Sequence, residues 1–137
     1  MKKYVVALDE MDGMIEDIAK DFTHGVVILR GDLAAGKTTF VKKMARFLGV
    51  EEEVTSPTFS LQHRYGDRLS HYDIYNHGLE HFISLGMLEE LERDGLHFVE
   101  WGDDELVKIL NSAGMDIMTI DIEKISDDKR EYTTCIY

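Results

Sequence analysis

Residues 31–39, which read GDLAAGKTT, restrict the possible folds of this 137-residue chain more than any other segment. They follow the apolar run VVIL and precede a segment in which apolar residues recur at helical spacing. Gly31, Gly36, Lys37 and Thr38 fit the pattern G-x-x-x-x-G-K-[ST], which forms a phosphate-binding loop when a strand precedes it and a helix follows. The sequence therefore predicts a buried strand, a tight loop and a helix in that order.

The residue types in this loop suit the binding of nucleotide phosphates. Glycine allows backbone angles at which successive N–H groups point inward and form a nest for phosphate oxygens. The N-terminus of the following helix adds a partial positive charge. We expect Lys37 to reach the β- and γ-phosphates and the Thr38 hydroxyl to coordinate Mg²⁺.

Hydrolysis of a bound nucleotide needs an acidic group at the end of a neighbouring strand, and the sequence offers two candidates. Asp73 ends the alternating run LSHYD, and Glu100 ends the apolar run LHFVE. A carboxylate at such a strand end can hold Mg²⁺ or orient the attacking water. We predict this function for Glu100, whereas for Asp73 a functional role and a merely solvated strand end are both open.

Strands and helices alternate along the chain around the glycine loop, which predicts an α/β fold. Gly66-Asp67, between two alternating segments, indicates a hairpin, and the polar segment 126–130 indicates a turn between two closing strands. The expected class is a three-layer P-loop NTPase-like sheet, mixed parallel and antiparallel, flanked by helices. The predicted strands are 3–8, 26–29, 58–65, 68–75, 96–101, 115–125 and 131–137, and the predicted helices are 14–22, 40–48, 79–93 with an interruption at Gly86, and 103–110.

Length and composition narrow the class of protein. We expect residues 1–137 to form a single domain, because the length suits one core and no repeat or linker-like stretch interrupts the chain. The 27 acidic residues against 15 basic ones give a net charge of −12, which disfavours direct binding of nucleic acid. Cys135 is the only cysteine, so neither an internal disulfide nor a cysteine zinc cluster is possible. With no long apolar segment and no cleavage site near the N-terminus, we expect a soluble, cytoplasmic protein without membrane contact.

Four motifs in a fixed order make this chain resemble one known family. GDLAAGKTT is followed by SPTF at 56–59, HYDIY at 71–75 and VEW at 99–101. This series resembles the TsaE (YjeE) family, small ATPases of bacterial threonylcarbamoyladenosine tRNA modification. The resemblance covers residues from about 25 to 102 and is more specific than the phosphate loop alone.

The resemblance implies ATP and Mg²⁺ as cofactors, and a TsaB–TsaD-type protein complex as the partner that contacts tRNA, so that tRNA would be reached only indirectly. It also implies site residues. Thr38, Glu100 and Asp73 look like the metal-site residues, and Glu100 also like the residue needed for hydrolysis. Thr58 resembles the switch threonine near the γ-phosphate, and Lys37 is central to the phosphates. The residues that would contact the nucleotide are Gly31, Ala34, Ala35, Gly36, Lys37, Thr38, Thr39, Trp101 and Arg130.

The sequence departs from the family pattern at three positions. Ala34 stands where the family has glycine, Asn76 where arginine is usual, and Gly102 where a proline follows VEW. None of these changes removes a predicted phosphate or metal group. They put in doubt only a salt bridge or partner contact that the family's arginine, replaced here by Asn76, would make.

Three histidines, His71, His77 and His81, lie close in sequence to Asp73. Two of them have the spacing of a helical metal pair, but Gly78 interrupts the segment, so we predict solvated surface histidines.

Two other functions stay open at this stage. A small-molecule kinase would use the same phosphate loop, although the six arginines form no cluster that would clamp a phosphate. A non-hydrolysing module, in which the nucleotide only orders a partner-binding loop, would need neither Glu100 nor Thr58. The leading prediction is an ATPase that acts as an accessory subunit in tRNA modification.

Overall fold

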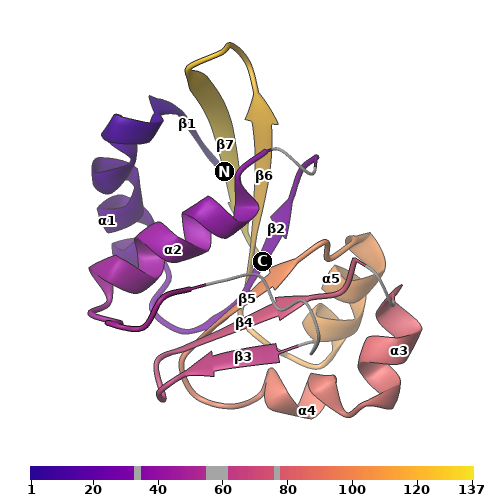
Figure 1. The fold of residues 1–137 in the computed structure, drawn as a ribbon. Helices are drawn as coiled ribbons and strands as arrows, with labels where there is room; N and C mark the ends of the chain where they lie inside the picture. The colour runs from indigo at the N-terminus through magenta and orange to yellow at the C-terminus, as the bar shows by residue number, and fades with distance from the viewer. Residues whose placement is uncertain (33–34, 55–61, 76–77) are drawn as a thin grey trace.

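The computed structural model describes residues 1–32, 35–54, 62–75 and 78–137. The strands of this part are β1 (Lys2–Ala7), β2 (Gly25–Arg30), β3 (Gln62–Tyr65), β4 (Leu69–Asp73), β5 (Leu96–Glu100), β6 (Ile117–Lys124) and β7 (Lys129–Ile136). The helices are α1 (Met11–Asp21), α2 (Lys37–Phe47), α3 (Gly78–Ser84), α4 (Met87–Glu90) and α5 (Asp104–Ser112), with a 3₁₀ turn η1 (Leu8–Glu10). The strands form one sheet in the order β1-β7-β6-β2-β5-β4-β3 (Figure 1).

The centre of the sheet is parallel and its two margins are antiparallel. β2 pairs in parallel with both β5 and β6, and β5 pairs in parallel with β4. β3 and β4 form an antiparallel hairpin, as do β6 and β7, and β1 adds to β7 in antiparallel orientation. The carboxyl ends of β2, β4, β5 and β6 therefore meet at one edge of the sheet, where the loop after β2 also lies.

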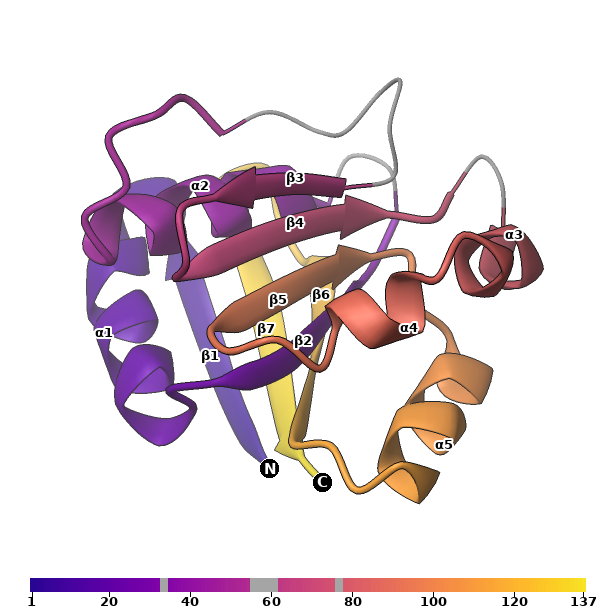
Figure 2. The same ribbon diagram turned by 90° about the horizontal axis from the view of Figure 1, so that it is seen from below.

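Alternate residues of β2 face two separate cores, which explains why this strand is apolar throughout. Val27 and Leu29 belong to the core under α1 and α2, whereas Val26 and Ile28 belong to the core under α3, α4 and α5. Figure 2 shows these two groups of helices on opposite sides of the sheet.

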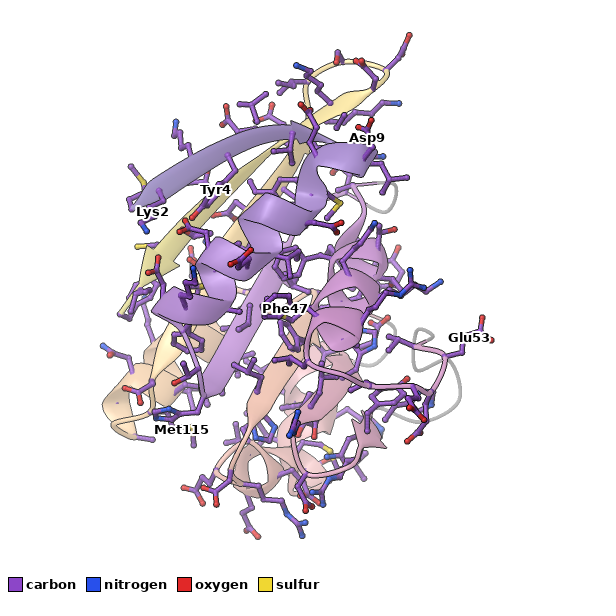
Figure 3. The ribbon with its side chains drawn as sticks, turned by 90° about the vertical axis from the view of Figure 1, so that its left-hand side faces the viewer. Lys2, Tyr4, Asp9, Phe47, Glu53 and Met115 are labelled. Atoms are coloured by element: carbon purple, nitrogen blue, oxygen red, sulfur yellow. The ribbon has the colours of Figure 1, made fainter. Side chains whose placement is uncertain are left out.

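Helix α1 turns its apolar stripe toward the sheet and is also tied to β1 by side-chain bonds. Lys2 Nζ donates to Asp21 at 2.6 Å, and the Tyr4 hydroxyl donates to Asp17. Figure 3 shows Lys2 and Tyr4 on β1, beside α1. The helix is therefore fixed to the margin of the sheet by polar as well as apolar contacts.

The structure confirms the predicted fold class, a mixed sheet with helices on both faces. It also confirms the hairpin at Gly66-Asp67, with Tyr65 paired to Leu69, although residues 58–61 of the predicted strand lie outside the described residues. The predicted interruption of helix 79–93 at Gly86 is confirmed, because the chain adopts a left-handed conformation there, with φ 76°, and α3 and α4 lie on either side of it. The sequence places Arg130 just before the last strand, but β7 already begins at Lys129.

Gly102, one of the departures from the family pattern, lies against Ile28 and Leu106 of the core under α3, α4 and α5. A Cβ atom there would come within 2.6 Å of Ile28 Cγ2 and 3.1 Å of Leu106 Cδ2. A larger residue at this position would therefore require the side chains of Ile28 and Leu106 to shift.

Within the described residues, no helix is both long enough and apolar enough to cross a membrane.

Gly13→Ala is expected to raise the free energy of unfolding by about 0.5–1 kcal/mol, because glycine in a helix interior loses more backbone freedom on folding than alanine does. Gly13 lies inside α1, and a Cβ atom there meets nothing within 4 Å. Urea unfolding followed by circular dichroism measures the change. Gly25→Ala is the control and should be destabilising, because Gly25 has φ 119° and its Cβ would lie 2.6 Å from Asp116 O. Equal effects of the two substitutions would contradict these separate roles of the two glycines.

Candidate functional site

The loop between β2 and α2 is built on two glycines with positive φ. Gly31 has φ 154°, and a Cβ atom on it would lie 2.6 Å from Ile122 O and 2.9 Å from Ala35 Cβ. Gly36 has φ 101° and directly precedes the first residue of α2, Lys37. The loop therefore delivers the chain to the N-terminus of α2 through a turn that other residues would strain. Ala34 lies outside the described residues, while Thr39 is half-buried in the first turn of α2.

Lys37 points its ammonium group back into the loop. Its Nζ donates to Gly31 O and Asp32 O, both at 2.7 Å, and lies 3.8 Å from the centre of the Trp101 ring. The side chain is only 3% exposed. Burial lowers the pKa of Lys37, and the carboxylates of Glu100, Asp32 and Asp73 oppose that shift. The loop thus holds a buried cation with acceptors that an anionic ligand can replace.

Trp101 adopts a conformation that is costly for its residue type. Its φ is 70°, and among the described residues it alone combines a positive φ with a side chain. Such backbone strain costs of order 1–3 kcal/mol and is concentrated at functional sites. The backbone N–H of Trp101 donates to Leu29 O at 3.1 Å. The indole ring packs on the Tyr75 ring, with centroids 4.5 Å apart. The sharp bend after Glu100 therefore places an aromatic wall beside Lys37.

Glu100 is the carboxylate at the centre of the site. It is 3% exposed and lies at the end of β5, next to Leu29 of β2 and Asp73 of β4. Thr38 Oγ1 donates to Glu100 Oε2 at 2.9 Å, and His71 Nε2 contacts the same oxygen. Residues from α2, β4 and β5 thus converge on one oxygen atom.

Asp73 ends β4 beside Glu100 and is less enclosed. Its Oδ1 accepts the backbone N–H of Tyr75 at 2.9 Å. Burial raises the pKa of the Asp73 carboxyl, and the negative charge of Glu100 raises it further. Two adjacent carboxylates and the Thr38 hydroxyl are hard oxygen donors, the type that Mg²⁺ prefers.

These three donors fit Mg²⁺, which commonly binds through one or two carboxylates and the phosphates of its substrate. A cation would also relieve the repulsion that raises the pKa of Asp73. No group of three or more histidine, cysteine, aspartate or glutamate side chains that could hold a metal occurs among the described residues. The site therefore suits a metal that arrives with a phosphate ligand better than one held by protein alone.

Arg130 reaches the phosphate loop from β7. A Cβ atom on Gly36 would lie 3.6 Å from Arg130 Nε, so the guanidinium group borders the loop. On this side of β2, away from Glu100, a cavity of about 510 Å³ opens beside Gly31 and Ala35. Its other lining residues are Arg30, Asp32, Asp121, Ile122, Glu123, Lys124, Glu131 and Thr133. The cavity offers space for an uncharged part of a ligand whose anionic part binds the loop.

The structure thus brings together five residues with predicted roles, namely Lys37, Thr38, Asp73, Glu100 and Trp101. Thr58 lies outside the described residues. The prediction of solvated histidines is wrong for His71, which is fully buried, although His81 is exposed and His77 lies outside the described residues. The alternation of LSHYD was the available signal, because residues two apart on a strand share a face and His71 therefore faces the same side as Asp73.

Arg30 is a second residue that sequence reasoning missed. Its guanidinium group donates to Asp121 at 2.8 and 3.1 Å and to Asp104 at 2.6 Å. These bonds join the end of β2 to β6 and to the start of α5. They brace the bend that contains Trp101 against the strand that leads into the phosphate loop.

Comparisons with known proteins agree on one family. The protein-family model described as "Threonylcarbamoyl adenosine biosynthesis protein TsaE" matches residues 6–132 of this chain. A protein of Treponema pallidum named tRNA threonylcarbamoyladenosine biosynthesis protein TsaE is 40% identical over 111 residues, covering 79% of each chain. A Bacillus subtilis protein of the same name is 38% identical, covering 79% of this chain and 67% of that protein. The crystal structure of Bacillus subtilis YdiB is similar in fold, with TM-score 0.70 and 31% identity, covering 99% of this chain and 86% of that one.

Asp73→Asn is expected to stabilise the metal-free protein at pH 7 by up to about 1 kcal/mol. The pKa of Asp73 is raised in the folded state, so its ionised form is less favourable there than in the unfolded chain and lowers stability at neutral pH. The gain should shrink as the pH falls toward about 4 and vanish below it, where the carboxyl is protonated in both states. Asparagine keeps the acceptor for the Tyr75 N–H.

Urea unfolding between pH 3 and pH 8 tests this expectation, with Asp127→Asn in the exposed β6–β7 turn as the matched control. Loss of stability on Asp73→Asn at pH 7 would contradict this expectation, because it would show that the ionised carboxylate stabilises the folded protein.

Proposed function

Because this chain belongs to the TsaE family, we propose that it is an ATPase subunit required for threonylcarbamoyladenosine modification of tRNA. The observation that carries the proposal is the hydrogen bond from Thr38 Oγ1 to Glu100 Oε2. It places the hydroxyl of the phosphate loop and a strand-end carboxylate at one point, with Lys37 and Asp73 nearby.

Each residue has a role that follows from its position. The backbone N–H groups of the loop and the N-terminus of α2 bind phosphate oxygens. Lys37 exchanges its carbonyl partners, Gly31 O and Asp32 O, for phosphate oxygens and neutralises their charge. The Thr38 hydroxyl and the carboxylates of Asp73 and Glu100 would hold Mg²⁺, which would neutralise phosphate charge there.

Hydrolysis needs a group that orients water toward the γ-phosphate, and we assign this role to Glu100. Glu100 is buried, accepts the Thr38 hydroxyl and contacts His71, so little reorganisation of its carboxylate is needed during the reaction. Asp73 is more accessible and its pKa is raised, which suits a carboxylate that binds the cation. The nucleoside would extend from Gly36 past Arg130 into the cavity beside β6 and β7.

The partner would be a TsaB–TsaD-type protein complex that itself contacts tRNA. The chain has 12 more acidic than basic residues, and such an excess of negative charge repels the phosphates of RNA. ATP hydrolysis would then drive a change in the assembled complex rather than transfer the threonylcarbamoyl group.

Glu100→Gln separates this function from that of a module that only binds nucleotide. In a purified system containing the partner proteins, tRNA and ATP, the variant should lower the multiple-turnover rate of modification by roughly 100-fold or more, as loss of a general base does. Its affinity for ATP in the absence of Mg²⁺ should be retained, because the loop is intact. Glu105→Gln on the exposed start of α5 is the matched control and should behave as the unsubstituted protein.

Undiminished multiple-turnover yield with Glu100→Gln would contradict an ATPase role. Transfer of phosphate from ATP to a metabolite would instead favour a kinase.

Trp101 should report nucleotide binding directly, because it is the only tryptophan and Lys37 Nζ lies 3.8 Å from its ring. If bound phosphates draw the ammonium group away from the ring, ATP should change the tryptophan emission on excitation at a wavelength that tyrosine does not absorb. Lys37→Met should remove the change and weaken ATP binding roughly tenfold or more, since charge-assisted hydrogen bonds are lost. An emission spectrum insensitive to saturating ATP would contradict this placement of the phosphates.

A further inference from the structure

His71 is a fully buried histidine whose ring contacts the carboxylate of the site. It lies on β4, where it pairs with Phe98 of β5, and its relative exposure is 0%. Its side chain faces the same side of the sheet as Asp73, two residues later. His71 Nε2 lies against Glu100 Oε2, the oxygen that also accepts the Thr38 hydroxyl.

The chemistry of the pair fixes which atom donates. An ionised carboxylate has only acceptor sites, so a hydrogen bond between these two groups requires the tautomer of His71 that has its proton on Nε2, and this N–H donates to Glu100 Oε2. Two donors, one from β4 and one from α2, therefore hold the same oxygen, Oε2. These contacts restrict rotation of the carboxylate about χ3, a torsion angle that otherwise has a broad distribution in glutamate side chains.

The other nitrogen of His71 shows that the ring is not there for packing alone. Among the described residues, Nδ1 has no hydrogen-bond partner although it is buried. An unsatisfied buried polar atom costs about 1–3 kcal/mol, which a phenylalanine ring in the same place would avoid. The polar contact that this ring makes in the described part of the chain is the one to Glu100.

His97 gives an internal comparison. It is also buried, at 1% exposure, and lies on β5, three residues before Glu100 and facing the opposite side of the sheet. Both of its nitrogens have partners, with Nδ1 2.8 Å from the Tyr72 hydroxyl and Nε2 2.7 Å from Arg93 O. His97 thus serves the stability of the sheet, whereas His71 directs its bond to the site.

We propose that His71 is a positioning residue that holds Glu100 in the orientation required for Mg²⁺-dependent ATP binding and hydrolysis, an inference that rests on the function proposed above. His71 touches neither nucleotide nor metal in this arrangement and acts only through the carboxylate. Groups that orient the ligands of a metal site typically change metal affinity roughly 10- to 100-fold when removed.

The test compares His71→Phe, which fills the site without a donor, with His71→Gln, whose amide can restore a donor near the position of Nε2. His97→Phe is the matched control for loss of a buried histidine. The measured quantity is the ratio of ATP affinities with Mg²⁺ and with EDTA, obtained by isothermal titration calorimetry on protein shown to be folded by circular dichroism.

His71→Phe should lower this ratio roughly tenfold or more and leave the affinity in EDTA unchanged. His71→Gln should recover most of the loss, and His97→Phe should lower thermal stability without changing the ratio. A folded His71→Phe with the original ratio overturns the proposal. An equal loss in His97→Phe overturns it as well.

A second readout needs no nucleotide. In ¹⁵N–¹H spectra of the free protein, His71 should be protonated at Nε2, with a slowly exchanging ring proton that is lost in Glu100→Ala. Absence of that proton overturns the positioning role whatever the nucleotide affinity. If the proton is present but the unsubstituted protein binds no ATP, the pairing of His71 with Glu100 stands and the proposed function fails.

Discussion

The hydrogen bond between Thr38 and Glu100 joins residues 62 positions apart and depends on the parallel pairing of β2 with β5. That pairing places Leu29 beside Glu100, so the loop after β2 and the bend after β5 leave the sheet side by side. The loop then turns directly into α2, which brings the Thr38 hydroxyl over the end of β5. A shift of one residue in the pairing would move Glu100 to the opposite face of the sheet. The register of two strands thus sets the geometry of the whole site.

Several features of the site lower the stability of the protein. Trp101 adopts a positive φ, burial lowers the pKa of Lys37, the pKa of Asp73 is raised, and His71 leaves Nδ1 without a partner among the described residues. Each feature brings a ring, a charge or a donor into a confined space at the carboxyl edge of the sheet. Such local costs persist only where the surrounding structure enforces them. Here the buried residues of the two cores pack against both faces of the strands that end at the site.

Local sequence rules were sufficient to predict the architecture and the residues that lie in motifs. The helical stripes of α1 and α2 and the Gly66-Asp67 hairpin follow from periodicity and turn chemistry, and the structure confirms them. Lys37 is recognisable because its glycine loop lies between a strand and a helix, and Glu100 because it ends an apolar strand. His71 is not, because a histidine in an alternating segment can face solvent or core, and only the tertiary packing of that face of β4, where the ring meets Glu100 of β5, decides between them. Arg30 likewise gains its role from carboxylates 74 and 91 positions away, a proximity that follows from topology rather than from local pattern.

Whether Thr38, Glu100 and Asp73 form one metal site against the phosphate loop can be decided by anomalous diffraction. The crystal would contain Mn²⁺ in place of Mg²⁺, together with a nonhydrolysable ATP analogue. We expect one strong metal peak about 2 Å from Thr38 Oγ1, beside both carboxylates, with Lys37 Nζ moved from Gly31 O and Asp32 O onto phosphate. A metal peak remote from Thr38, or an analogue bound while Lys37 keeps its carbonyl partners, would contradict this site.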